Sequence, residues 1–161
     1  MNDILLKTEK LSKSFSNSGA LQHVLRNIDL QLYKGDFTVI MGASGAGKST
    51  LLYALSGMDI TFGEKVISDL DSDELAVFRR DHCGFVFQQI YLIDSMSVMD
   101  NVLAAGLLVS KEKNELVARA KELFGAVGIS EETQKKFPTQ ISGGEAQRVG
   151  IVRALINSPE I

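Results

Sequence analysis

The sequence of 161 residues contains no tryptophan, one cysteine, two prolines and two histidines. The single cysteine, Cys83, excludes an internal disulfide and any zinc site built on cysteine pairs, and it opens an apolar stretch in which packing is its expected role. No uninterrupted apolar run approaches the roughly 20 residues of a membrane-spanning helix, and residues 1–10 lack the charged-then-apolar order of a signal peptide. We therefore expect a cytoplasmic chain that reaches a membrane only through a partner.

Positive charge is also scarce, because 17 Lys and Arg residues stand against 20 Asp and Glu residues and the formal net charge is −3. Without a basic cluster, nucleic acid is not expected as the main partner. Hydrophobic residues make up 45% of the chain, which is enough for the core of one domain.

A glycine-rich segment, residues 42–49, fits the phosphate-loop pattern G-x-x-x-x-G-K-[ST]. An apolar run at 37–41 leads into it, and residues 49–55 lead out of it with helix-forming composition. Glycines in such a strand–loop–helix unit let backbone N–H groups converge on phosphate oxygens, while the lysine reaches the β- and γ-phosphates and the Ser hydroxyl holds Mg²⁺. A glycine turn with a lysine nearby is the alternative interpretation. The candidate nucleotide contacts are Gly42, Ala43, Ser44, Gly45, Ala46, Gly47, Lys48, Ser49 and Thr50.

A second glycine pair occurs in residues 141–148, Ile-Ser-Gly-Gly-Glu-Ala-Gln-Arg. Ser142 and Glu145 have the spacing of a capping box, in which the two residues satisfy each other's backbone N–H groups at a helix start. The segment also resembles the L-S-G-G-Q signature of ATP-binding cassette (ABC) ATPases. Both interpretations can hold, because a capped helix start with glycines is itself an anion site.

The resemblance extends to both sides of the phosphate loop. Residues 84–88 resemble the strand that leads into the Q-loop of ABC ATPases, with Gln88 as the Mg²⁺-facing glutamine and Gln89 as the alternative. Phe15 stands at the position of the aromatic residue that stacks on adenine; a core aromatic at a strand end is the alternative.

Membership of this family implies ATP and Mg²⁺ as cofactors, with Ser49 and Gln88 facing the metal. It also implies a homodimer in which each nucleotide lies between one phosphate loop and the signature of the other subunit. The signature contacts would be Ser142, Gly143, Gly144 and Glu145.

Within the family, residues 79–88 and 101–102 most resemble the group that serves lipoprotein release, macrolide export and peptide-antibiotic resistance, together with the division ATPase FtsE. Asp94 favours the peptide-antibiotic branch. The implied protein is an ATP-hydrolysing subunit on the inner face of the cell membrane. It would couple ATP to a membrane permease through a groove at residues 88–109. The alternatives are a regulatory ATPase of the FtsE kind and an inactive nucleotide-binding fragment; a DNA-repair ATPase is disfavoured because the interval between the motifs is too short for a coiled coil.

Three departures from the family pattern are evident. The sequence ends at residues 158–161, where members continue into the Walker B aspartate, the catalytic glutamate and the switch histidine, and neither His23 nor His82 can replace that histidine. We therefore expect a truncated chain that contains no catalytic residues and does not hydrolyse ATP. A hairpin after Gly63 is expected to be short. Glu145 replaces the usual glutamine, and we expect its carboxylate to turn back onto its own helix start.

The expected fold is α/β, a P-loop NTPase core of ABC type with a mainly parallel sheet, a reduced antiparallel β-subdomain and a helical insertion. Strands are predicted at 4–11, 24–32 and 37–41. Helices are predicted at 71–80, 97–109, 113–124 and 145–156, and Glu115 and Arg119 form an i,i+4 pair on the third. All of residues 1–161 would form one partial ATP-binding domain, divided into 1–89, 90–140 and 141–161.

Overall fold

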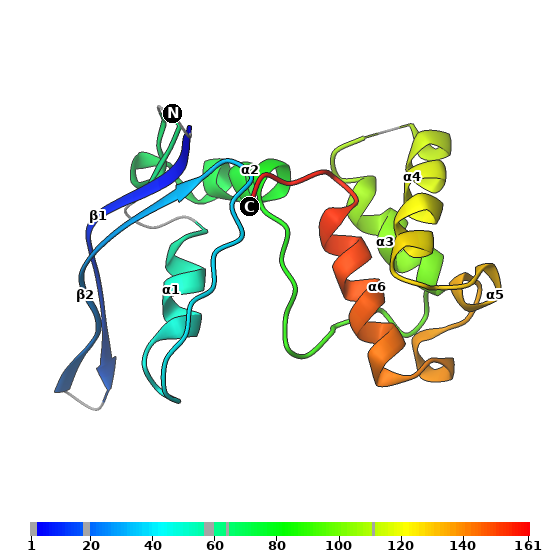
Figure 1. Cartoon of the computed structure of the whole chain (residues 1–161), viewed down its shortest axis with the longest axis horizontal. Coiled ribbons are helices and arrows are strands. Elements are labelled where there is room, and N and C mark those ends of the chain that lie inside the picture. Colours follow the sequence, from blue (N-terminus) through cyan, green and yellow to red (C-terminus); the bar gives the residue numbers. More distant parts are fainter. Residues whose placement is uncertain (1–2, 18–19, 57–59, 64, 111) are drawn as a thin grey trace. The chain divides into compact units, whose positions relative to one another are not determined.

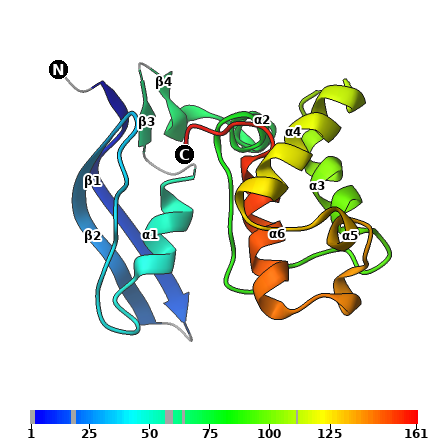
Figure 2. The same cartoon turned by 45° about the vertical axis from the view of Figure 1, so that its right-hand side comes forward.

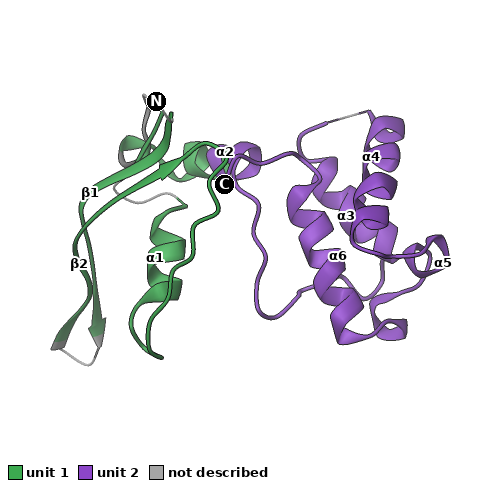
Figure 3. Cartoon of the chain, viewed as in Figure 1, with its two compact units in different colours: residues 1–77 green, residues 78–161 purple. Residues whose placement is uncertain are grey.

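The computed structural model describes residues 3–17, 20–56, 60–63, 65–110 and 112–161. These residues form two compact units, Met1–Val77 and Phe78–Ile161, shown in different colours in Figure 3. None of the described helices is long and apolar enough to cross a membrane.

The first unit is built on a long hairpin of β1 (Ile4–Asn17) and β2 (Ala20–Tyr33). β1 also pairs with β3 (Ile60–Phe62), which pairs with β4 (Lys65–Val66), so the sheet order is β2-β1-β3-β4 and every described pairing is antiparallel (Figure 2). The hairpin register shifts where Lys10 and Asn27 adopt left-handed backbone, at φ 51° and 48°. The short β3–β4 pair agrees with the expected reduction of the β-subdomain.

Helix α1 (Lys48–Ala54) packs on this hairpin (Figure 1). Ala54 joins Leu11 and Leu25 in a buried apolar cluster, and Leu51 and Val24 pack against it. This cluster holds the middle and the C-terminal end of α1 against the hairpin. The 3₁₀ turn η1 (Ile67–Asp69) then leads to α2 (Ser72–His82).

The start of α2 has the capping pair that the sequence predicts. The Asp71 carboxylate accepts from the backbone N–H groups of Asp73 and Glu74, both at 2.9 Å. In return the Glu74 carboxylate accepts from the backbone N–H of Asp71 at 3.1 Å. These bonds satisfy helix-start donors that have no partner within the helix.

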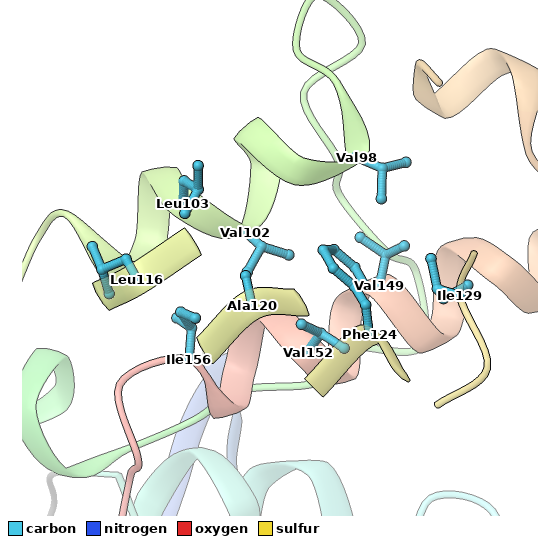
Figure 4. Close-up of a cluster of buried hydrophobic side chains, with 10 residues drawn as sticks. All are labelled: Val98, Val102, Leu103, Leu116, Ala120, Phe124, Ile129, Val149, Val152 and Ile156. Atoms are coloured by element: carbon cyan, nitrogen blue, oxygen red, sulfur yellow. The ribbon is translucent and has the colours of Figure 1, made fainter. Parts of the chain in front are cut away.

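The second unit continues with α3 (Val98–Gly106), α4 (Lys113–Ala126), α5 (Glu131–Gln134), the 3₁₀ turn η2 (Pro138–Gln140) and α6 (Gly143–Leu155). Apolar side chains of α3, α4 and α6 meet in one buried core (Figure 4). The face predicted for α4 is confirmed, since Leu116, Ala120 and Phe124 are buried. Arg119, predicted to pair with Glu115, instead donates to the carbonyl oxygens of Ile156 (2.9 Å) and Leu155 (3.3 Å).

The strands expected at 37–41 and 84–88 are the main difference from the prediction. Both segments run without strand pairing, and Phe37 and Met41 are 94% and 85% exposed. A strand needs a neighbour for its backbone groups, and within these segments the only backbone bond among the described residues joins Gly84 to Ile161. Ile161 donates to the His82 carbonyl (3.0 Å) and Gly84 donates to the Ile161 carbonyl (2.8 Å), but neither segment forms a strand there.

Gly84 has little room at this contact, because a Cβ there would lie 2.6 Å from the Ala154 carbonyl oxygen. The neighbouring Cys83 is partly buried, and burial raises the pKa of its thiol to about 11. A thiol that stays protonated at neutral pH is a poor nucleophile, in agreement with the packing role expected for Cys83.

Candidate functional site

The phosphate loop lies between the extended segment 37–41 and α1. Gly45 and Gly47 adopt left-handed backbone, at φ 79° and 86°, which glycine adopts without the Cβ penalty of other residues. Gly47 is also the N-cap of α1, and no side chain caps this helix start. No side chain therefore occupies the first N–H groups of α1, and such groups suit an anion, as the phosphate-loop pattern predicts.

Gly47 is constrained from a second direction. A Cβ at this position would lie 3.1 Å from Cγ1 of Val24 and 3.3 Å from the Val24 carbonyl oxygen. The loop thus passes close to the backbone of β2, and this contact together with the left-handed backbone restricts the position to glycine.

Lys48 begins α1 and its side chain extends over the loop. Its ammonium donates to the carbonyl oxygens of Gly42 (2.9 Å) and Ala43 (2.7 Å). Ser49 is exposed and Thr50 is half-buried on the same first turn. A cation, a set of helix-start N–H groups and a hydroxyl therefore converge at one end of α1, which is the donor set that a triphosphate with Mg²⁺ requires.

Phe15 lies on β1 opposite Gln22, in the same unit as the loop. Its ring is 48% exposed, and the Lys13 ammonium lies 5.8 Å from the ring centroid. This exposure contradicts the core-aromatic alternative. A half-exposed ring of this kind can stack on another flat group.

The signature segment forms the N-terminus of α6 in the second unit. The Ser142 hydroxyl accepts from the Glu145 N–H at 3.2 Å, and the Glu145 carboxylate accepts from the Ser142 N–H and from its hydroxyl, both at 2.8 Å. The two bonds from Ser142 hold the pKa of the Glu145 carboxyl below its usual value. The expected turn of Glu145 onto its own helix start is confirmed, and Gly143 and Gly144 stay exposed beside it.

Gln88 lies in the second unit, exposed on the segment between α2 and α3. Its neighbour Gln89 accepts a hydrogen bond from the Tyr91 hydroxyl at 2.8 Å. Because this bond holds Gln89 locally, Gln88 remains the preferred candidate for the Mg²⁺-facing glutamine.

Both histidines interact with neighbours inside their own unit. His23 Nδ1 lies 2.6 Å from the Ser14 hydroxyl, and His82 Nδ1 lies 3.0 Å from the Glu160 carboxylate. Among the described residues there is no group of three His, Cys, Asp or Glu side chains that could hold a metal. A hydroxyl such as that of Ser49, together with phosphate oxygens, suits Mg²⁺, which is usually held by few protein ligands.

One buried polar residue that holds the segment after Gln88 was missed in the sequence, where Asn101 served only to indicate a resemblance. Asn101 is 2% exposed on α3. Its side-chain oxygen accepts from the Ile93 N–H at 2.7 Å, and its amide nitrogen donates to the carbonyls of Ile93, Met96 and Ser97 at 3.1, 3.2 and 3.0 Å. The available signal was a polar residue on the apolar face of a helix.

Comparison with known proteins gives a consistent result. The ABC transporter family model matches residues 25–161. The lipoprotein-releasing system ATP-binding protein LolD of Idiomarina loihiensis is 36% identical, and the alignment covers 100% of this chain and 73% of that protein. The macrolide export ATP-binding/permease protein MacB of Wolinella succinogenes is 38% identical, again over 100% of this chain but only 26% of MacB.

Solved structures resemble the chain equally closely. A dimeric ATP-binding cassette in a post-hydrolysis state, bound to ADP and Pi, is 34% identical and superposes with a TM-score of 0.88, covering 96% of this chain and 71% of that one. CbiO1 of Clostridium perfringens, part of an ABC transporter complex, is 28% identical with a TM-score of 0.81, covering 98% of this chain and 63% of that one. The ABC-type P-loop fold expected from the sequence is thereby confirmed.

Proposed function

The chain belongs to the ABC transporter family, and from that premise we propose that it is the ATP-binding subunit of a membrane complex that exports antimicrobial peptides or handles lipoproteins. Names of relatives support the class, since LolD belongs to a lipoprotein-releasing system and MacB to macrolide export. Its role would be to couple ATP binding and hydrolysis to a membrane permease.

The geometry at the start of α1 supports the nucleotide assignment most directly. Gly47 caps the helix without a side-chain partner, and Lys48 holds its ammonium over the loop at the carbonyls of Gly42 and Ala43. An ATP phosphate there would meet N–H donors and a cation together. Ser49 would hold Mg²⁺, Phe15 would stack on adenine, and the family resemblance supports Gln88 as a further Mg²⁺ contact.

Replacing Lys48 with Ala tests this assignment. We expect the variant to bind a fluorescent ATP analogue at least about tenfold more weakly, or roughly 1.4 kcal/mol, because the variant loses the cation over the loop. Lys34→Ala is the matched control, since Lys34 belongs to the same unit but lies outside the loop. Equal affinity of the wild type and a folded Lys48→Ala variant would refute the assignment.

Dimerisation on ATP is the second part of the proposal. The exposed Gly143 and Gly144 at the capped start of α6 would meet the γ-phosphate held by the loop of a second copy. A dimeric structure of a cassette that is 34% identical supports this mode of assembly.

ATP hydrolysis is the activity of the family. Turnover is expected to depend on the carboxylates that the resemblance places after Ile161, so we propose that residues 1–161 by themselves bind ATP without sustained hydrolysis. Phosphoryl transfer relies on positioning and charge stabilisation, and a loop without the water-activating group supplies only part of this. A phosphate-release assay on the purified chain is the measurement. Turnover that Lys48→Ala abolishes would contradict the proposal.

A permease would bind near the segment that follows Gln88. Tyr91 and Ile93 are 67% and 48% exposed, whereas Leu92 and Met99 pack against the core. A pocket of about 300 Å³ in the same unit is lined by apolar side chains that include Phe85, Phe87 and Leu108, with Arg80 and Arg153 among its polar lining. Exposed aromatic side chains beside an apolar pocket suit a helix of a membrane partner.

A further inference from the structure

The start of α6 already holds an anion that belongs to its own chain. The Glu145 carboxylate accepts from the backbone N–H and from the hydroxyl of Ser142, both at 2.8 Å. Hydrogen bonds to a carboxylate are charge-assisted and stronger than bonds between neutral groups. The negative charge of Glu145 therefore occupies the end of α6 at which the helix dipole favours an anion.

The same bonds use up the donors that Ser142 could offer to a phosphate. A serine hydroxyl has a single proton, and Ser142 donates it to Glu145 while its oxygen accepts from the Glu145 N–H at 3.2 Å. The Ala146 N–H is bound to the Ser142 carbonyl at 2.9 Å. An external anion is left with the N–H groups of Gly143 and Gly144, which stand at the first two positions of α6, where a helix supplies no acceptor.

Two cations lie near the Glu145 carboxylate. After the bonds from Ser142, the charges of Arg148 and Lys136 also lower the pKa of the Glu145 carboxyl. Lys136 pairs with Glu132 at 2.9 Å, whereas the Nε of Arg148 is buried without a hydrogen-bond partner among the described residues. Side chains three residues apart on a helix are neighbours. A carboxylate that leaves Ser142 could therefore move to Arg148.

We propose that the Glu145 carboxylate competes with the γ-phosphate of a second copy for the start of α6 and thereby weakens the ATP-driven dimer. The inference rests on the proposed function, because that phosphate arrives on the phosphate loop of the other copy. For the phosphate to bind, the Ser142 hydroxyl must turn its proton from Glu145 to a phosphate oxygen, and the carboxylate must move away. Glu145 is thus a positioning residue whose charge sets how tightly two copies associate.

Glu145→Gln tests the competition on the 161-residue chain. Glutamine retains the capping box, because its side-chain oxygen can accept from the Ser142 N–H, but it carries no charge. In sedimentation at MgATP concentrations that saturate the phosphate loop, dimers of Glu145→Gln should be at least about tenfold tighter than wild-type dimers, because each dimer contains two such contacts. Equal or weaker association of Glu145→Gln would overturn the proposal, as would a failure of both proteins to associate.

Glu122→Gln is the matched control. Glu122 is exposed on α4 in the same unit, so its substitution removes the same charge and leaves the start of α6 intact. Dimers of Glu122→Gln should be as tight as those of the wild type. A gain equal to that of Glu145→Gln would assign the effect to the net charge of the chain and would refute a specific role of Glu145.

The salt dependence distinguishes competition between anions from a structural effect of the substitution. Between about 0.01 M and 0.1 M salt the Debye length falls from about 30 Å to about 10 Å, so the advantage of Glu145→Gln over the wild type should shrink. If Glu145 served only as a helix cap, Glu145→Gln would change the unfolding midpoint and the ratio of the two dimer constants would not depend on salt. That result would overturn the proposal.

Titration with the fluorescent ATP analogue, at protein concentrations too low for dimers, separates this failure from failure of the proposed function. A wild type that does not bind the analogue would refute both proposals. A wild type that binds it, combined with no gain in association for Glu145→Gln, would refute only the competition.

Discussion

Replacing Gly47 with alanine is expected to destabilise the first unit and to weaken nucleotide binding together. Alanine is unfavourable in left-handed backbone at φ 86°. Its Cβ would also crowd Val24, at 3.1 Å from Cγ1 and 3.3 Å from the carbonyl oxygen. Gly35→Ala is the matched comparison, because Gly35 has φ 79° in the same unit and a Cβ there meets nothing within 4 Å.

Comparison with Gly35→Ala separates the cost of left-handed backbone, which both variants share, from the cost of crowding, which only Gly47→Ala meets. Left-handed backbone costs a non-glycine residue about 1–2 kcal/mol. An alanine also reduces the entropy of the unfolded chain, which stabilises the folded state by about 0.4–1 kcal/mol in both variants. Crowding in a packed site adds about 1–3 kcal/mol, and only Gly47→Ala meets it. The free energy of opening should therefore fall by about 1–3 kcal/mol more in Gly47→Ala than in Gly35→Ala.

Hydrogen exchange of amides in β2 and α1 measures this opening within the first unit, so that the second unit does not enter the comparison. Titration with the fluorescent ATP analogue should show weaker binding for Gly47→Ala and unchanged binding for Gly35→Ala. If the two variants open with the same free energy, the contact between the loop and Val24 does not determine the stability of this unit.

Two further predictions concern the second unit. The pKa of the Glu145 carboxyl is lower in the folded state, so its stabilisation is complete above the ordinary value of 4.5 and is lost as pH falls through the lower folded value. In acid unfolding, the wild type should lose stability relative to Glu145→Gln as pH falls below about 5, and parallel curves would contradict this. Tyr91→Glu, at an exposed position, should reduce co-purification with the permease while preserving ATP affinity. Met99→Glu, at a position packed against the core, should unfold the unit. Undiminished co-purification of Tyr91→Glu would place the docking surface elsewhere.

Local features of the fold were predictable because their causes are close in sequence. The capping pairs of Asp71 with Glu74 and Ser142 with Glu145 depend on residues three positions apart, and the buried face of α4 depends on helical periodicity. The same is true of the glycines in the phosphate loop. The roles assigned there to Lys48 and Ser49 stay predictions.

Features that depend on distant partners were not predictable. The apolar composition of residues 37–41 predicts a strand, but strand pairing requires a neighbour that the sequence of the segment does not specify. Arg119 has a carboxylate one turn away and still bonds to the end of α6, because the carbonyls of Leu155 and Ile156 lie within its reach. Asn101 was recognisable as an asparagine in an apolar helix, but its four bonds depend on how residues 93–97 fold back.

The register shifts of the β1–β2 hairpin also bear on the solubility of the first unit. β2 is an outer strand of the sheet, and a long regular outer strand offers a template on which other chains can add. Asn27, with φ 48°, interrupts that row of backbone groups, and the exposed Arg26 and Asp29 place charge on either side of the interruption. At the opposite edge β4 has only two residues. Neither edge therefore presents a long uninterrupted strand, which is one of the ways in which proteins limit edge-to-edge association.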